Sequence, residues 1–186
     1  MIHRFYCYIS ILMIFVLFSN CKESESSKLN KMVSVPIKFS LESFERIDGK
    51  FQIEPFVMKD FKFVVFADST ECMSCSISKM HKWNNFCDSL LSYYDISFLY
   101  ILSPPIQEYN VVREKLMHNQ LSFPAFLDRD KKFANLNKNI PSASLYHVFI
   151  LDQNNKIIYV GDPREKETLS KILFKSIACL RKHDSV

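Results

Sequence analysis

The chain has 186 residues, a length typical of one domain, and 48% hydrophobic and 24% charged residues, the composition of a globular protein. Its only two glycines are Gly49 and Gly161, which excludes a glycine-rich phosphate loop or a dinucleotide-binding motif. The formal net charge is +4, and because basic and acidic residues are mixed along the chain, no nucleic-acid partner is predicted.

The first 20 residues have the pattern of an export signal. A short polar start precedes the apolar run 5–18, which fits a signal peptide but is shorter than the roughly 20 residues that span a bilayer. Cys21 follows shortly after this run and resembles the lipid-modified cysteine of a bacterial lipoprotein. This resemblance predicts a lipoprotein signal peptide over 1–20, lipidation of Cys21 and a flexible polar tether over 21–35. The alternatives are an ordinary cleaved signal or an uncleaved anchor.

The segment around two closely spaced cysteines carries the candidate chemistry. Residues 61–67 are mostly aromatic or β-branched and predict a buried strand, and residues 68–70 offer side chains that cap a helix. Cys72 and Cys75 follow at the start of a predicted amphipathic helix. A helix N-terminus stabilises an anion and lowers the pKa of a cysteine thiol placed there. We therefore expect Cys72 to attack as a thiolate and Cys75 to close a disulfide, the alternative being a thiol pair without a redox role.

The other cysteines suggest core packing. Cys87 lies on the apolar face of the same helix, about 18 Å beyond Cys75, and Cys179 borders the apolar face of the last helix. His81 is the histidine nearest to the cysteine pair, but it falls about 180° around the helix from Cys72. A structural zinc site is therefore not predicted.

The remaining pattern predicts one α/β domain over residues 36–186. Strands and helices alternate after a leading strand pair, and a hairpin and a closing helix complete the domain. The other predicted strands are 37–44, 49–56, 96–102, 123–127, 147–151 and 156–160. The other predicted helices are 106–119 and 166–182, and residues 133–139 are predicted to form a short turn or helix.

This order of elements, with the cysteine pair at the start of a helix, resembles the thioredoxin fold and most closely the thioredoxin-like redoxin lipoproteins of the Bacteroidota. The resemblance implies a central mixed β-sheet flanked by helices, with Cys72 as nucleophile and Cys75 as resolving thiol, and it implies no cofactor. It further implies a lipid-anchored protein of the cell envelope, with disulfide-containing exported proteins as substrates and an inner-membrane thiol carrier as electron donor. The likeness covers roughly residues 38–180, and its matching segments are 63–69, 72–75, 123–128, 147–157 and 161–163.

Three positions depart from the thioredoxin pattern. Tyr146 occupies the place of the cis-proline, and since a cis bond before a non-proline residue costs about 2.5–4 kcal/mol, we expect a trans bond and a reshaped substrate groove lined by Tyr146 and His147. Phe66 occupies the place of a buried acid, so the proton-shuttling acid of the family has no matched position. Glu71 replaces a tryptophan, and its carboxylate is expected to raise the pKa of the adjacent thiol.

Three other functions are compatible with the sequence. Cys72, Cys75 and His147 form a candidate Cu(I) site, since soft thiolates favour that ion. A peroxidase of the peroxiredoxin type needs a proline and then a threonine or serine before its reactive cysteine; Ser69 fits the second position but Val65 occupies the first. The third alternative is a non-catalytic binding module that keeps the fold.

Overall fold

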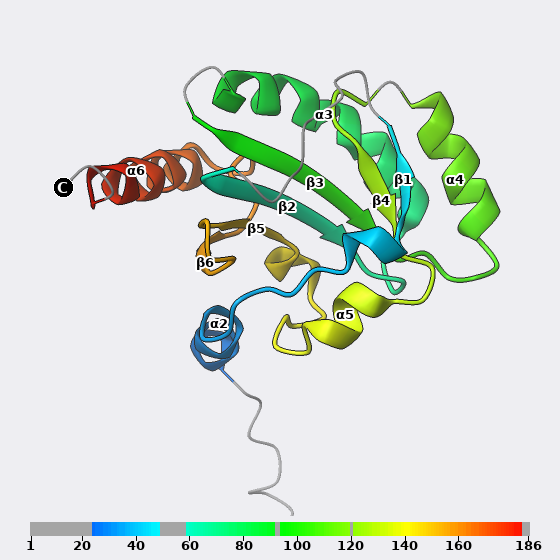
Figure 1. Cartoon of the computed structure of the whole chain (residues 1–186), viewed down its shortest axis with the longest axis horizontal. Helices are drawn as coiled ribbons and strands as arrows, with labels where there is room; N and C mark the ends of the chain where they lie inside the picture. The colour runs from blue at the N-terminus through cyan, green and yellow to red at the C-terminus, as the bar shows by residue number, and fades with distance from the viewer. Residues whose placement is uncertain (1–23, 49–58, 92–93, 120, 184–186) are drawn as a thin grey trace, which may run out of the picture.

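The computed structural model describes residues 24–48, 59–91, 94–119 and 121–183, with side chains of the last helix described up to residue 178 (Figure 1). The predicted signal peptide and Cys21 lie outside these residues. A mixed sheet of six strands in the order β1-β4-β3-β2-β5-β6 forms the centre of the structure. The strands are β1 (Glu45–Ile47), β2 (Phe61–Ala67), β3 (Ile96–Leu102), β4 (Ala125–Leu127), β5 (Val148–Leu151) and β6 (Ile157–Val160).

The two central strands are buried on both faces of the sheet. All residues of β3 are buried, and β2 has a single half-buried residue. Such largely apolar runs are typical of parallel strands that helices cover on both sides. β2, β3 and β4 run parallel to one another, whereas β1 is antiparallel to β4, β5 to β2, and β6 to β5. The α/β class and the central mixed sheet predicted from the sequence are therefore confirmed.

Helices cover both faces of this sheet, as Figure 1 shows. Buried residues of α3 (Met73–Leu91), α4 (Tyr109–His118) and α6 (Glu167–His183) belong to one hydrophobic core. Those of α2 (Glu25–Val33) and α5 (Lys132–Leu136) belong to a second core on the opposite face. The helix that begins beside the cysteine pair is thus held by the first core.

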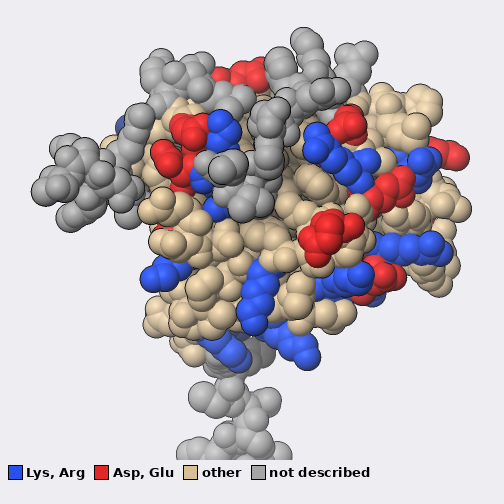
Figure 2. Space-filling view, viewed as in Figure 1, with Lys and Arg blue, Asp and Glu red and all other residues tan. Residues whose placement is uncertain are grey.

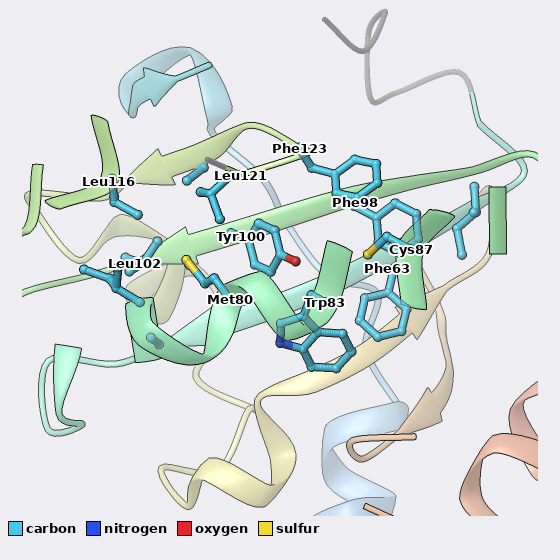
Figure 3. Close-up of a cluster of buried hydrophobic side chains, with 14 of the residues drawn as sticks. Phe63, Met80, Trp83, Cys87, Phe98, Tyr100, Leu102, Leu116, Leu121 and Phe123 are labelled. Atoms are coloured by element: carbon cyan, nitrogen blue, oxygen red, sulfur yellow. The ribbon is translucent and has the colours of Figure 1, made fainter. Parts of the chain in front are cut away.

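Aromatic packing fixes α3 on the sheet. The ring of Phe63 on β2 lies 5.1 Å from the ring of Trp83 on α3 and 5.4 Å from that of Phe98 on β3, measured between centroids (Figure 3). Cys87 is fully buried in the same cluster, as the sequence predicted. Because these contacts lie about three to four turns along α3 from its start, they fix the direction of the helix over the sheet and so the place of its N-terminus.

A tight turn joins β5 to β6, as the hairpin prediction required. The Asp152 carboxylate accepts the backbone N–H groups of Asn154 and Lys156, each at 2.8 Å. Asn155 adopts a left-handed conformation with φ 60°, which asparagine tolerates better than most residues. The turn is also tied to the central sheet, because the buried ammonium of Lys62 donates to the Asp152 carbonyl at 3.3 Å.

The segment expected to be a flexible tether contains a helix instead. Within the predicted tether 21–35, Glu25–Val33 forms α2, with Ser24 capping its first turn. Met32 is fully buried, and the side-chain amide of Asn139 donates to the Met32 carbonyl at 2.9 Å. The tether prediction is therefore wrong for α2, because one buried side chain and a distant hydrogen-bond donor hold a segment whose composition is polar.

The predicted leading strands also differ from the structure. Residues 37–44 do not form a strand; Leu41–Ser43 is a short 3₁₀ helix, and the strand β1 comes only after it. The chain is instead held by Ile37, which is 2% exposed and whose N–H donates to the Asn155 carbonyl at 2.8 Å. The other predicted strand, 49–56, lies outside the described residues.

Charge and hydropathy of the described residues agree with the sequence pattern. On the face shown in Figure 2, Lys and Arg side chains are interspersed with Asp and Glu side chains. Among the described helices, none combines the length and apolar character that crossing a membrane requires.

Candidate active site

The cysteine pair lies at the junction of a buried strand and a helix. β2 ends at Ala67, a turn follows, and α3 begins at Met73. In the turn, the Asp68 carboxylate accepts the N–H of Thr70 at 3.0 Å, and the Asp68 carbonyl accepts the N–H of Glu71 at 2.9 Å. These short-range bonds follow from the polar residues that the sequence places directly after the strand. They deliver Cys72 to the position immediately before the helix.

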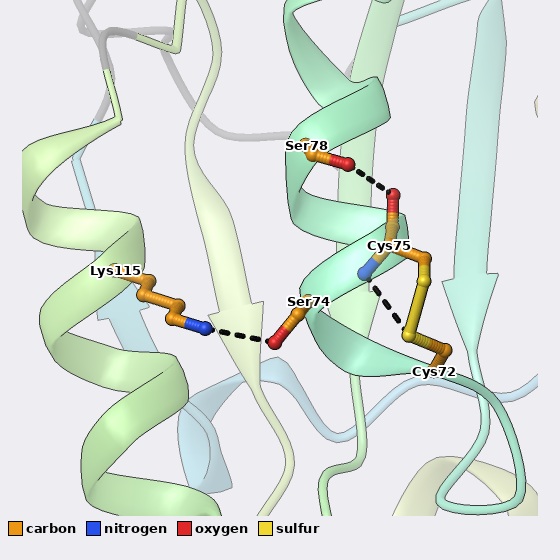
Figure 4. The surroundings of a disulfide bond; sticks show 5 residues. All are labelled: Cys72, Ser74, Cys75, Ser78 and Lys115. Atoms are coloured by element: carbon orange, nitrogen blue, oxygen red, sulfur yellow. Dashed lines mark hydrogen bonds between the residues drawn. A yellow bond between two sulfur atoms is a disulfide. The ribbon is translucent and has the colours of Figure 1, made fainter.

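Cys72 and Cys75 form a disulfide at this helix start (Figure 4). Their Cα atoms are 5.2 Å apart, within the range of disulfides in proteins. The N–H of Cys75 points at Cys72 Sγ at 3.3 Å. Both residues are exposed. A donor in the first helical turn that faces Sγ stabilises negative charge on this sulfur, so the geometry favours a thiolate at Cys72 when the disulfide is reduced.

A cation from another helix lies next to the two helical residues between the cysteines. Lys115 Nζ on α4 donates to the Ser74 hydroxyl at 2.8 Å (Figure 4). Ser74 and Lys115 are 41 positions apart, and nothing in the local sequence pattern indicates the contact. The ammonium adds positive charge near the cysteine pair, although its exposure to solvent weakens this effect.

His147 is buried rather than placed on an open groove. It is 2% exposed, and its ring lies against the ring of Phe66, with 4.9 Å between centroids. Nδ1 lies 2.6 Å from Glu71 Oε1, and Nε2 lies 2.9 Å from the Pro141 carbonyl oxygen. Glu71 was predicted to raise the pKa of the adjacent thiol; in the structure its carboxylate contacts His147 and accepts the N–H of Asp68 at 3.0 Å.

The segment at Tyr146, predicted to line a reshaped substrate groove, forms a short turn beside an open pocket. Ser144–Tyr146 forms a 3₁₀ turn in which the N–H of Tyr146 donates to the Ala143 carbonyl at 3.0 Å. No peptide bond of the described residues is cis, so the bond before Tyr146 is trans, as expected. The Tyr146 ring is buried and its hydroxyl donates to the Glu25 carboxylate, whereas Leu145 is 60% exposed. Tyr146 and Leu145 both line an open pocket of about 740 Å³.

The candidate Cu(I) site is not assembled in this arrangement. Both ring nitrogens of His147 are engaged, one by Glu71 and the other by the Pro141 carbonyl. Binding a metal together with Cys72 and Cys75 would require His147 to leave at least one of these partners. Over the described ranges, no group of three or more His, Cys, Asp or Glu residues is placed to hold a metal ion.

Solved structures of other proteins are similar to this chain. A solution structure of an uncharacterized thioredoxin-like protein from Porphyromonas gingivalis is 19% identical, with a TM-score of 0.50 over 75% of this chain and 90% of that one. A putative thiol:disulfide interchange protein DsbE from Chlorobium tepidum is 13% identical, with a TM-score of 0.47 over 72% of this chain and 92% of that one. No protein-family model matches the chain, and neither does any curated protein. The first likeness establishes that the fold is thioredoxin-like, as the sequence predicted.

Proposed function

We propose that this thioredoxin-like chain is a thiol–disulfide oxidoreductase that acts through Cys72 and Cys75. The observation that carries the proposal is the exposed disulfide at the start of α3, with the Cys75 N–H directed at Cys72 Sγ. An exposed pair is accessible to a partner protein, and a helix N-terminus favours the thiolate that attacks a disulfide. A disulfide with a purely structural role is less expected here, because both sulfurs lie outside the two cores that hold the domain.

The reaction transfers two electrons between cysteine pairs. In the reducing direction, Cys72 Sγ attacks one sulfur of a substrate disulfide, a mixed disulfide forms, and the other substrate sulfur leaves as a thiolate. Cys75 then attacks Cys72 Sγ, and the second substrate sulfur leaves. The protein ends oxidised with the Cys72–Cys75 bond closed, and the substrate ends as two thiols.

The reduction potential tests this proposal directly. We expect the Cys72–Cys75 pair to equilibrate with glutathione or dithiothreitol couples and to show one two-electron transition. Trapping of free thiols by a mass-changing reagent, followed by peptide mass spectrometry, measures the oxidised fraction at each ratio. The reduced protein is expected to reduce insulin disulfides stoichiometrically. Failure of wild-type protein to close the bond at any ratio, or to reduce insulin at all, contradicts the proposal.

We further propose that the protein is lipid-anchored in the cell envelope and acts on disulfide-containing exported proteins, with an inner-membrane thiol carrier as electron donor. The support is the apolar run 5–18 followed by Cys21, both in the sequence only. Metabolic labelling with a fatty acid in a bacterial host is expected to modify the full-length chain and to be lost in Cys21→Ala. The matched control Cys7→Ala should keep the label. Unchanged labelling of Cys21→Ala would refute lipidation at this residue.

A further inference from the structure

Glu71 and His147 form an interacting pair directly before Cys72. Glu71 comes from the turn that precedes α3, and His147 comes from the junction between the 3₁₀ turn Ser144–Tyr146 and β5. The side chain of His147 is 2% exposed and that of Glu71 is 22% exposed. The two residues are 76 positions apart, and the N–H of Phe66 on β2 donates to the His147 carbonyl at 2.8 Å, which holds the His147 backbone beside the strand that leads to the cysteines.

The hydrogen-bond partners determine how many protons this pair holds. The Pro141 carbonyl can only accept, so His147 Nε2 carries a hydrogen. Glu71 Oε1 already accepts the amide hydrogen of Asp68, and it lies 2.6 Å from His147 Nδ1. Without a hydrogen in that gap, a nitrogen lone pair would face a carboxylate oxygen. The pair therefore holds one proton between Nδ1 and Oε1, either as an imidazolium with a carboxylate or as a neutral imidazole with a carboxylic acid.

A cavity with both polar and apolar walls extends from this pair along the first turns of α3. Its volume is about 190 Å³, larger than the roughly 30 Å³ that one water molecule occupies in the liquid. Glu71, His147 and Ser76 line it, and Ser76 directly follows Cys75. The N–H of Ser76 donates to the Cys72 carbonyl at 3.0 Å. Neither cysteine lines the cavity itself, but the cavity reaches Glu71 and Ser76, the residues on either side of the Cys72–Cys75 segment.

The charged groups around the pair come from three elements. Asp68 lies in the same turn, with its carboxylate bound to the Thr70 N–H and the Ser69 hydroxyl. Lys79 on α3 lines the cavity. From the segment after β6, Asp162 and Arg164 line it as an ion pair at 2.7 Å, so their charges largely offset each other. The Glu71–His147 pair differs from these charged groups because its two side chains share one proton.

We propose, on the basis of the function proposed above, that Glu71 and His147 act together as the proton carrier for disulfide exchange at Cys72 and Cys75. When Cys72 attacks a substrate disulfide, the first departing substrate thiolate takes the shared proton. The pair, left with a lone pair facing a carboxylate, recovers a proton from the Cys75 thiol as Cys75 attacks Cys72 Sγ. The second substrate thiolate takes its proton from solvent. Overall, one solvent proton is consumed, the Cys75 proton passes to the substrate, two electrons pass from the cysteines to the substrate, and the pair is unchanged.

The test separates turnover from the first attack. In Glu71→Gln, the amide can still donate to His147 but cannot share a proton with it. We expect turnover with insulin at neutral pH to fall about 100-fold, the lower range for loss of a general acid–base group. The rate of Cys72 alkylation by iodoacetamide in the reduced protein should not fall. Added imidazole should restore part of the turnover at fixed pH, an effect that a purely structural role does not produce.

Matched controls and further variants complete the test. Glu108→Gln, an exposed change at the start of α4, should leave turnover and alkylation unchanged. The double variant Glu71→Gln with His147→Asn should lose no more turnover than the less active of the two single variants. The effects of residues that act as a unit are not additive. Glu71→Asp keeps a carboxylate and should lose less turnover than Glu71→Gln. This variant keeps the proposal testable if the Glu71→Gln protein does not fold.

Three results would overturn the proton-carrier assignment. They are turnover of Glu71→Gln within about threefold of wild type, a parallel loss of turnover and Cys72 alkylation, or a loss that imidazole does not rescue. Each presupposes an active wild-type protein. Wild-type protein without any disulfide reduction removes the proposed function itself, so the two failures are distinguishable.

Discussion

Replacement of Cys72 by serine is expected to abolish disulfide reduction, with a loss of at least about 10³-fold, since removing an enzyme's nucleophile has effects of this size or larger. A serine hydroxyl does not ionise near neutral pH, and the thiolate is the species that attacks a disulfide. The exposed position of Cys72 and the Cys75 N–H directed at its sulfur favour Cys72 as the attacking residue in the proposed reaction. Single-turnover reduction of insulin by stoichiometric, pre-reduced protein measures the effect without interference from an added reductant.

Cys87→Ser is the matched control for this experiment. Cys87 is fully buried against the sheet, and burial raises the pKa of its thiol, so it stays protonated and unreactive in the folded protein. The Cys87→Ser protein should retain wild-type activity per folded molecule, even though a buried hydroxyl lowers its stability. Equal activities of the two serine variants, at any level, would remove Cys72 from its assigned role.

Phe63→Ala is expected to lower the free energy of unfolding by about 3–5 kcal/mol, the range found when a buried aromatic side chain is truncated. Phe63 is 1% exposed and contacts Trp83 and Phe98, so its removal leaves a cavity between β2, β3 and α3. Urea unfolding at 25 °C followed by far-ultraviolet circular dichroism measures the change, because this signal does not depend on the surroundings of Trp83.

Ile106→Ala provides the control for the core variant. Ile106 is 53% exposed, and exposed substitutions usually change stability by less than about 0.5 kcal/mol. A Phe63→Ala loss no larger than that of Ile106→Ala would show that the aromatic cluster does not hold α3. The cluster matters for function because it positions the helix start that carries Cys72.

The two central strands of this chain were predictable to the residue. The predicted strands 61–67 and 96–102 coincide with β2 and β3, and the hairpin at Asp152 is present as expected. In each of these segments the determinants are local, namely apolar runs, β-branched residues and turn-forming side chains. The helix after Cys72 was predictable for the same reason, since its apolar residues recur at helical spacing.

The chain before β1 was not predictable in this way. Its composition suggested a tether and a leading strand, whereas the structure has α2 and a 3₁₀ helix. α2 is held by burial of Met32 and by the bond between the Glu25 carboxylate and the Tyr146 hydroxyl, 121 positions away. A short polar helix has little stability by itself, so its formation depends on contacts that no local window contains.

By itself, the sequence determined the fold class and the place of Cys72 and Cys75 at the start of a helix, because periodicity, turn residues and spacing act over a few neighbouring positions. Only the tertiary structure decided that Glu71 meets His147 and that Lys115 approaches Ser74. These contacts depend on how the β2–α3 turn, the segment before β5 and α4 come together around the sheet. Burial of His147 then keeps both of its ring nitrogens on these protein partners, because neither nitrogen can exchange its partner for bulk water.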